Sequence, residues 1–154
     1  MAKEKVQLSH QTKIDILNVI LVLVVGFVLF ALYWLIYLGI YLALESAFYP
    51  NNPTEFPAII LRISCSIGLF LLYIGLLFTK VPTRYKAILS VGPNGIMMIM
   101  IVLAFYDNIF LFLGISLLFV AISIGVMIIR KVPWIYYVGT GYGFLIGYLY
   151  AWPR

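Results

Sequence analysis

The chain is organised as long apolar stretches separated by short polar or basic connections. A helix that crosses a hydrocarbon core of about 30 Å, at about 1.5 Å per residue, needs roughly 20 residues. Five stretches approach or exceed that length: Ile16–Phe48, Ala58–Phe78, Ala87–Tyr106, Ile109–Ile129 and Trp134–Trp152. Because backbone amides in lipid need partners within their own segment, each stretch predicts an α-helix. The pattern therefore predicts an all-α, polytopic integral membrane protein with a bundle of five transmembrane helices.

Composition agrees with this class and leaves little room for a soluble domain. Hydrophobic residues make up 65% of the chain and charged residues 10%, whereas soluble domains have roughly 45–50% and 25%. Outside the five stretches, the longest segments are a short basic N-terminal tail, residues 1–15, and the loop at 49–57. We expect residues 1–154 to form one membrane domain. The first stretch is too short for two crossings and a turn, so it predicts one long helix that tilts or projects from the bilayer.

Positive charge recurs on every second connection. In a five-span arrangement one side of the membrane collects eight of the ten Lys and Arg residues: Lys3, Lys5, Lys13, Lys80, Arg84, Lys86, Arg130 and Lys131. The positive-inside rule then predicts a cytoplasmic N-terminus and an outer C-terminus, and the expected location is a prokaryotic plasma membrane. The net charge of +5 is thereby attributed to topology and to anionic lipid headgroups, and no nucleic-acid partner is expected.

Two of the basic connections share a sequence. Lys-Val-Pro occurs at residues 80–82 and 131–133, each followed three residues later by tyrosine. The repeat is consistent with duplicated helical hairpins. It is also consistent with independent membrane-edge turns that use the same residue types. The second interpretation is favoured, because the segments after the two turns do not align without a gap.

Glu45 and Arg62 are the candidate ion pair of the outer side. Glu45 lies near the outer end of the first predicted helix, and Arg62 lies about one turn inside the second. An arginine inside a span is costly unless it has a partner, and a carboxylate matches its forked donor geometry. The pair is either a ligand or ion site or a structural contact. Arg62 alone reaching the headgroups is the third interpretation.

The first helix also carries a candidate aromatic groove. Its aromatic residues follow three- and four-residue steps, which places them on one helical face. They are Phe27, Phe30, Trp34, Tyr37 and Tyr41, with Phe48 further along. Such a face lines a groove for a prenyl tail, a quinone or an acyl chain, or it packs against neighbouring helices and lipid.

Glycines at positions 139, 143 and 147 form two overlapping Gly-x-x-x-Gly steps in the fifth stretch. Spacing of this kind makes a flat ribbon on which another helix can approach closely. We expect Gly139, Gly143 and Gly147 to be a helix-packing site. Internal packing and association with a second chain are both open.

The third stretch contains Pro93 and Asn94 between two glycines, Gly92 and Gly95. Proline removes a backbone hydrogen bond inside a helix, so a kink or a locally opened helix is expected. Asn94 beside an opened helix would be a polar site for an ion or a polar substrate, as in broken transporter helices. A structural kink is the alternative.

Motifs of catalysis and of metal binding are missing from the sequence. The one histidine is His10, in the tail, and no predicted span contains two acidic residues. Neither Gly-x-Ser-x-Gly nor His-Glu-x-x-His occurs, and there is no phosphate loop. We therefore expect no enzyme activity, no cofactor and no metal.

The expected function is that of a non-catalytic accessory or structural subunit in a larger membrane complex. Its partners would be membrane lipids and other membrane-protein subunits, or further copies of this chain. The alternative is a small oligomeric transporter or channel for a small solute, an ion or a lipid. A lipid-modifying enzyme is the third candidate.

Overall fold

The computed structural model describes residues 2–51 and 56–151, with side chains from Asp15 onward in these ranges. The described residues form five α-helices and no β-strand, which confirms the predicted all-α class for this part of the chain. The helices are α1 (Ala2–Phe48), α2 (Ala58–Phe78), α3 (Thr83–Ala104), α4 (Ile109–Ile129) and α5 (Trp134–Ala151). The bounds of α2 and α4 coincide with the predicted stretches. α3 begins four residues earlier than its predicted stretch, at the residue that follows Pro82.

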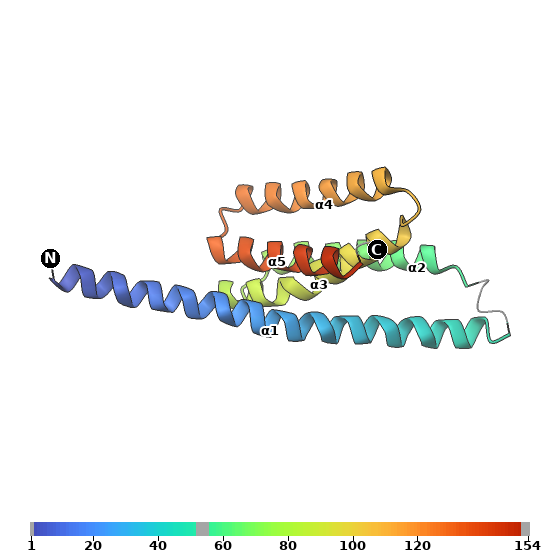
Figure 1. Ribbon diagram of the computed structural model, residues 1–154, viewed down its shortest axis with the longest axis horizontal. Coiled ribbons are helices and arrows are strands. Elements are labelled where there is room, and N and C mark those ends of the chain that lie inside the picture. The colour runs from blue at the N-terminus through green and yellow to red at the C-terminus, as the bar shows by residue number, and fades with distance from the viewer. Residues whose placement is uncertain (1, 52–55, 152–154) are drawn as a thin grey trace.

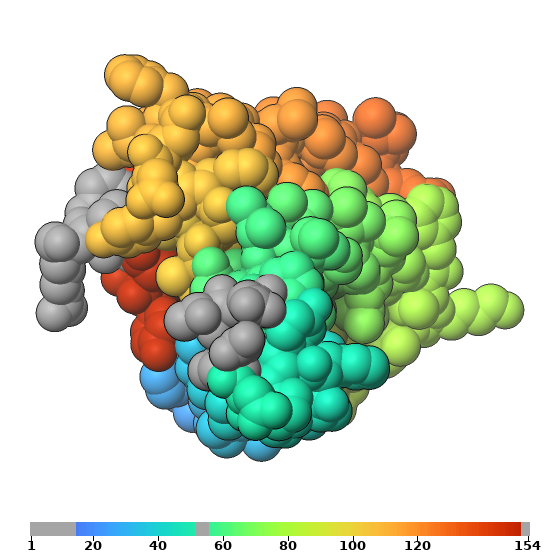
Figure 2. All heavy atoms as spheres, turned by 90° about the vertical axis from the view of Figure 1, so that its right-hand side faces the viewer, coloured from blue at the N-terminus to red at the C-terminus, as the bar shows by residue number. Residues whose placement is uncertain are grey.

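The helices lie side by side along one long axis (Figure 1). The N-terminal part of α1 extends past the other four helices at one end, so the segment expected as a tail is described as helix from Ala2. Viewed from the other end, α4 lies on the side of the bundle opposite to α1 (Figure 2). α3 occupies the centre and packs against α1, α2 and α5.

Four of the helices are long and apolar enough to cross a membrane. They are α1 from Asp15 onward, α2, α3 and α4, with mean hydropathies of 3.0, 2.1, 2.0 and 2.7. α5 does not belong to this group. It has 18 residues and is rich in tyrosine and glycine, which lowers its hydropathy although its length of about 27 Å approaches a bilayer core. A membrane protein is thus supported by four helices, and the fifth crossing stays a prediction.

The most buried of the four candidate spans is also the least apolar. In α3, 83% of the most apolar stretch is buried within the protein, whereas the corresponding values for α1, α2 and α4 are 17%, 11% and 17%. α3 is nevertheless the least apolar of the four. The outer helices expose many large aliphatic and aromatic side chains. A soluble monomer rarely exposes so much contiguous apolar surface, so this surface is suited to lipid.

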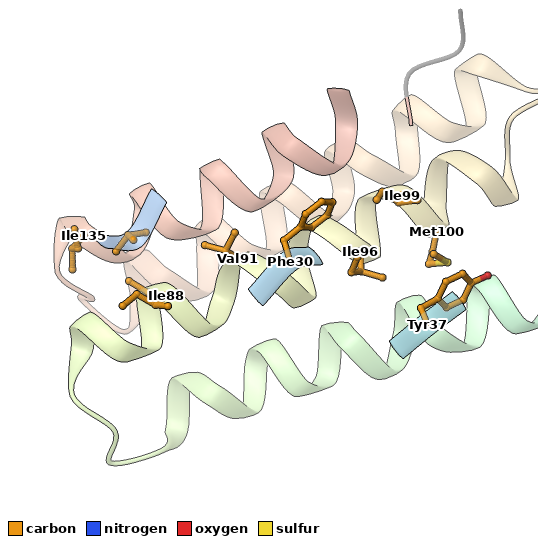
Figure 3. Packing of buried hydrophobic residues seen from close by; sticks show 10 residues of the cluster. Phe30, Tyr37, Ile88, Val91, Ile96, Ile99, Met100 and Ile135 are labelled. Atoms are coloured by element: carbon orange, nitrogen blue, oxygen red, sulfur yellow. The ribbon is translucent and has the colours of Figure 1, made fainter. Parts of the chain in front are cut away.

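The core is built where the aromatic face of α1 meets α3. Phe30 and Tyr37 of α1 are buried among Val91, Ile96 and Met100 of α3 (Figure 3). The aromatic rings fit there because α3 carries glycines: a Cβ atom on Gly95 would lie 2.6 Å from the Phe30 ring. The pairing of large rings with glycine brings the two helices close together.

Candidate functional site

Arg62, near the start of α2, is held by the end of α3. Its Nη1 atom donates a hydrogen bond of 2.8 Å to the carbonyl oxygen of Leu103. Leu103 lies in the last turn of α3, where carbonyl groups have no partner within the helix and the helix dipole is negative. The guanidinium group therefore caps the C-terminus of α3 and joins α2 to it.

The structure does not bring Glu45 and Arg62 together. Both side chains are half-buried, but the described residues contain no ion pair between them. The C-terminal carbonyl of α3 takes the place that the sequence reasoning assigned to the carboxylate. The sequence pattern predicted a partner on the adjacent helix α1, whereas the observed partner on α3 is 41 residues away from Arg62 in the sequence.

The guanidinium group keeps unused hydrogen-bonding capacity. Its Nε atom is buried and has no partner, and the Tyr37 hydroxyl group of α1 lies next to it. Arginine has five N–H donors, of which the bond to Leu103 uses one. The Arg62 cation thus lies at the junction of α1, α2 and α3 with no carboxylate partner among the described residues.

The glycine ribbon of α5 packs inside the chain, against α3. A Cβ atom on Gly143 would lie 2.7 Å from the Val91 carbonyl oxygen and 3.0 Å from Cβ of Asn94. Cβ atoms on Gly139 and Gly147 would collide with the carbonyl groups of Ala87 and Gly95. No side chain fits at any of the three positions, so the ribbon makes the closest helix contact of the bundle.

The contacts of the ribbon have one register. Gly139, Gly143 and Gly147 meet residues 87, 91 and 95, a constant offset of 52 residues. α3 and α5 are therefore parallel neighbours, each entered from a Lys-Val-Pro turn. Glycine Cα atoms that face carbonyl oxygens have the arrangement of weak Cα–H···O contacts, which recur at close helix–helix interfaces.

The predicted aromatic residues of α1 divide among several neighbours. Phe30 and Tyr37 are buried against α3, whereas Phe27 is 52% exposed. The Trp34 ring meets Tyr150 of α5 edge-on, with 5.4 Å between ring centroids. The Tyr41 ring meets Phe56 in the same way at 5.1 Å. The face therefore contributes mainly to packing within the chain.

α3 runs through Pro93 as one continuous helix. Asn94 is completely buried there, and neither its amide nitrogen nor its amide oxygen has a hydrogen-bond partner in the described structure. Buried amides are normally paired, because an unpaired one costs about 1–3 kcal/mol. Asn94 is therefore the most conspicuous unpaired polar group in the core.

A second buried polar cluster was missed by the sequence reasoning. Tyr73 of α2 and Thr140 of α5 share a hydrogen bond of 3.4 Å between their hydroxyl groups. Thr140 also contacts the sulfur atom of Met127 of α4 at 3.8 Å. The hydroxyl groups of Tyr136 and Ser123 are buried without a partner. The members of this cluster lie on three separate helices, so no local sequence pattern predicts it. The one sequence feature that points to it is the seven-residue spacing of Ser116 and Ser123, which places both on one face of α4.

The basic connections gather at one end of the bundle. Arg84 donates a hydrogen bond of 3.1 Å to the Asn18 side chain of α1. Arg130, after α4, lies over the ring of Phe78 at the end of α2, 4.0 Å from the ring centroid. The two Lys-Val-Pro turns and the first part of α1 thus share an end, as the charge pattern predicted; which side of the membrane this end faces stays a prediction.

Comparison of the chain with protein-family models, with curated proteins and with solved structures finds no match.

Proposed function

We propose that the protein is a non-catalytic subunit that packs against other chains in a larger membrane complex. The observation that carries this proposal is the length of α1. Its 47 residues make a helix of about 70 Å, more than twice the hydrocarbon thickness of about 30 Å. Its first turns extend past the other helices at the end where the basic turns lie (Figure 1). A helix that leaves its own bundle is suited to packing against another chain.

α4 supports the same proposal from the other side of the bundle. Only four of its 21 residues are buried: Phe112, Ser116, Ser123 and Met127. These residues lie on one narrow face, so most of the surface of α4 is available to lipid or to a neighbouring transmembrane helix. α1 and α4 occupy opposite sides of the bundle (Figure 2), which would allow the subunit to bridge two neighbours.

Native mass measurement after extraction in mild detergent tests this proposal. The expected result is a complex with at least one different chain. Ser9→Pro should break the projecting turns of α1, because proline in a helix interior costs about 3 kcal/mol or more. We expect this variant to lose its partner and to keep the thermal stability of the bundle, whereas Ser9→Ala keeps both. A native mass of one chain alone, or of copies of this chain, would contradict the proposal.

The second candidate is a small oligomeric transporter or channel, and Asn94 is the observation that favours it. An amide that is 0% exposed and has no partner is costly in a helix core. Intramembrane polar groups that are kept at such a cost often belong to a transport path. Asn94 lies one residue after Pro93, where a helix opens most readily.

Ion flux through liposomes separates the two candidates. Purified protein in vesicles loaded with KCl or NaCl would be assayed with ion-selective electrodes, beside Asn94→Leu. A channel or ion transporter would form a homo-oligomer, release ions faster than empty vesicles, and lose this release in the variant. A structural subunit would release none, and Asn94→Leu would raise its unfolding temperature by removing an unpaired amide.

A further inference from the structure

A groove runs between α1 and α2. Of the predicted aromatic residues of α1, Tyr37 lines this groove and the others do not. The groove has a cavity volume of about 290 Å³. Its walls are almost entirely apolar, with Ile36 and Ile40 from α1 and Leu72 from α2, and Ile96 of α3 contributes to its lining. A Cβ atom on Gly68, which also lines the groove, would have no neighbour within 4 Å. The missing side chain at this position therefore leaves the groove open.

The Arg62 cation lies near one end of this groove, next to residues that line it. Tyr37 lines the groove and places its hydroxyl group next to the Arg62 guanidinium group. Cys65, one helical turn after Arg62 on the same side of α2, lines the groove as well. No carboxylate of the described residues pairs with Arg62. The site thus joins a cation that has no carboxylate partner among the described residues to an apolar groove.

The dimensions of the groove match one leaflet of a bilayer. Arg62 lies four residues after the beginning of α2, close to the end of the bundle. Leu72, the last residue of α2 that lines the groove, follows ten residues later, which is about 15 Å along a helix. Half of a hydrocarbon core of about 30 Å has the same length. A molecule with its charge at Arg62 and its chain in the groove would therefore reach the middle of the bilayer.

We infer that this groove binds an anionic glycerophospholipid, with its phosphate on Arg62 and the Tyr37 hydroxyl group and one acyl chain against Gly68. Charge complementarity decides the class of ligand. A guanidinium group binds phosphate with strong, charge-assisted hydrogen bonds. A neutral quinone or prenyl alcohol would leave the guanidinium charge unneutralised. A zwitterionic lipid would bring a second cation beside it.

Competition between two lipids tests the inference. The full-length protein would be mixed with equal amounts of phosphatidylglycerol and phosphatidylcholine that carry the same acyl chains, and retained lipid would be counted by native mass spectrometry. The wild type should retain phosphatidylglycerol about tenfold more than phosphatidylcholine, because both lipids offer the phosphate but the choline ammonium places a second positive charge near Arg62. Arg62→Gln should abolish this preference, and Arg62→Lys should keep part of it. Equal retention of the two lipids by the wild type would overturn the inference.

A matched pair of glycine variants tests the groove itself and does not disturb the cap of α3. Gly68 and Gly75 lie two turns apart on α2, and a Cβ atom on either would meet nothing within 4 Å, but only Gly68 lines the groove. Gly68→Leu should reduce the retained phosphatidylglycerol about tenfold, whereas Gly75→Leu should retain as much as the wild type. Equal retention by the two variants would show that the acyl chain does not lie in this groove.

Discussion

At the residue scale, two cations of the chain stabilise helix C-termini. Arg62 donates to Leu103 at the end of α3. At the other end of the bundle, the Lys86 Nζ atom lies 2.6 Å from the carbonyl oxygen of Thr79 and 3.3 Å from that of Leu77, where α2 ends. Terminal carbonyls have no helical partner and carry the negative end of the helix dipole. Near a membrane, these carbonyl groups can hold a cation through their negative partial charge. A charged carboxylate in the same place would first have to lose its hydration.

A double-mutant cycle distinguishes this cap from an ion pair with Glu45. Arg62→Gln should destabilise the protein by about 1.5–3 kcal/mol, the range for a hydrogen bond to a charged group. Glu45→Gln should stay within about 0.5 kcal/mol of the wild type. The double variant should equal the sum of the two, since sites without a shared contact are additive within about 0.3–0.5 kcal/mol. Unfolding in detergent measures all three; a double variant that recovers stability would indicate a direct pair.

At the element scale, the bundle depends on the contact between α3 and α5. The glycines of α5 allow the carbonyl oxygens of Ala87, Val91 and Gly95 to approach the backbone of α5 directly. Lipid provides no hydrophobic force between helices, so close packing has to hold them together. The contact is well suited to this, because the three glycines of α5 have no side chain that would keep the two backbones apart.

Two alanine variants of α5 test the importance of this contact. Gly143→Ala places a Cβ atom 2.7 Å from the Val91 carbonyl oxygen, and we expect it to cost about 1–3 kcal/mol, as in overpacked cores. Gly141→Ala is the control, because its Cβ atom would meet nothing within 4 Å. It should be neutral or should stabilise by up to about 1 kcal/mol through helix propensity. Thermal unfolding compares them; equal stability of the two variants would mean that α3 can move away without loss.

The turn after α4 provides another test at this scale. Lys131 has a φ of 51°, in the left-handed region that favours glycine. The Lys131 N–H donates to the Ile128 carbonyl at 3.0 Å and the Val132 N–H to the Met127 carbonyl at 3.2 Å, which is the Schellman arrangement that ends many helices. Lys131→Gly should be more stable than Lys131→Ala by about 1 kcal/mol, because only the alanine keeps the strain of a Cβ atom. Both variants remove the same charge, so a difference of zero would contradict the left-handed conformation.

At the scale of the whole molecule, the distribution of apolar surface is that of a protein in lipid. The central helix has the lowest mean hydropathy of the four candidate spans and carries the buried Asn94, Ser90 and glycines. The outer helices α1 and α4 have the highest. In water this arrangement would expose the most apolar surfaces of the chain. In a bilayer it places polar groups inside the bundle and aliphatic side chains against acyl chains.

Topology is the prediction that belongs to this scale. A reporter inserted at Thr83, next to the basic turn, should lie in the cytoplasm, and one fused after Arg154 should lie outside. The two reporters also test whether α5 crosses the membrane, because α5 is the one helix of the five described that is not apolar enough to count among the candidate spans. Reporters on the same side would leave four crossings. A control fused before Ala2 should match the result at Thr83.

The sequence alone determined the properties that depend on local order along the chain. The length of the apolar stretches predicted the helical class and the bounds of α2 and α4, and the cations predicted which turns share an end. Glycine spacing predicted that α5 makes a close helix contact, because a bare face favours close packing whichever helix it meets. These properties follow from short-range geometry and from the solvation of individual residues.

Only the tertiary structure decided which partner each of these features meets. The glycine ribbon packs on α3 of its own chain, Arg62 binds a carbonyl 41 residues away, and Asn94 is buried without a partner. The polar contact between Tyr73 and Thr140 joins residues 67 positions apart. Helices in lipid have similar apolar faces, so hydrophobicity does not choose among neighbours; steric fit and the few polar groups do, and both depend on how all the helices pack at once.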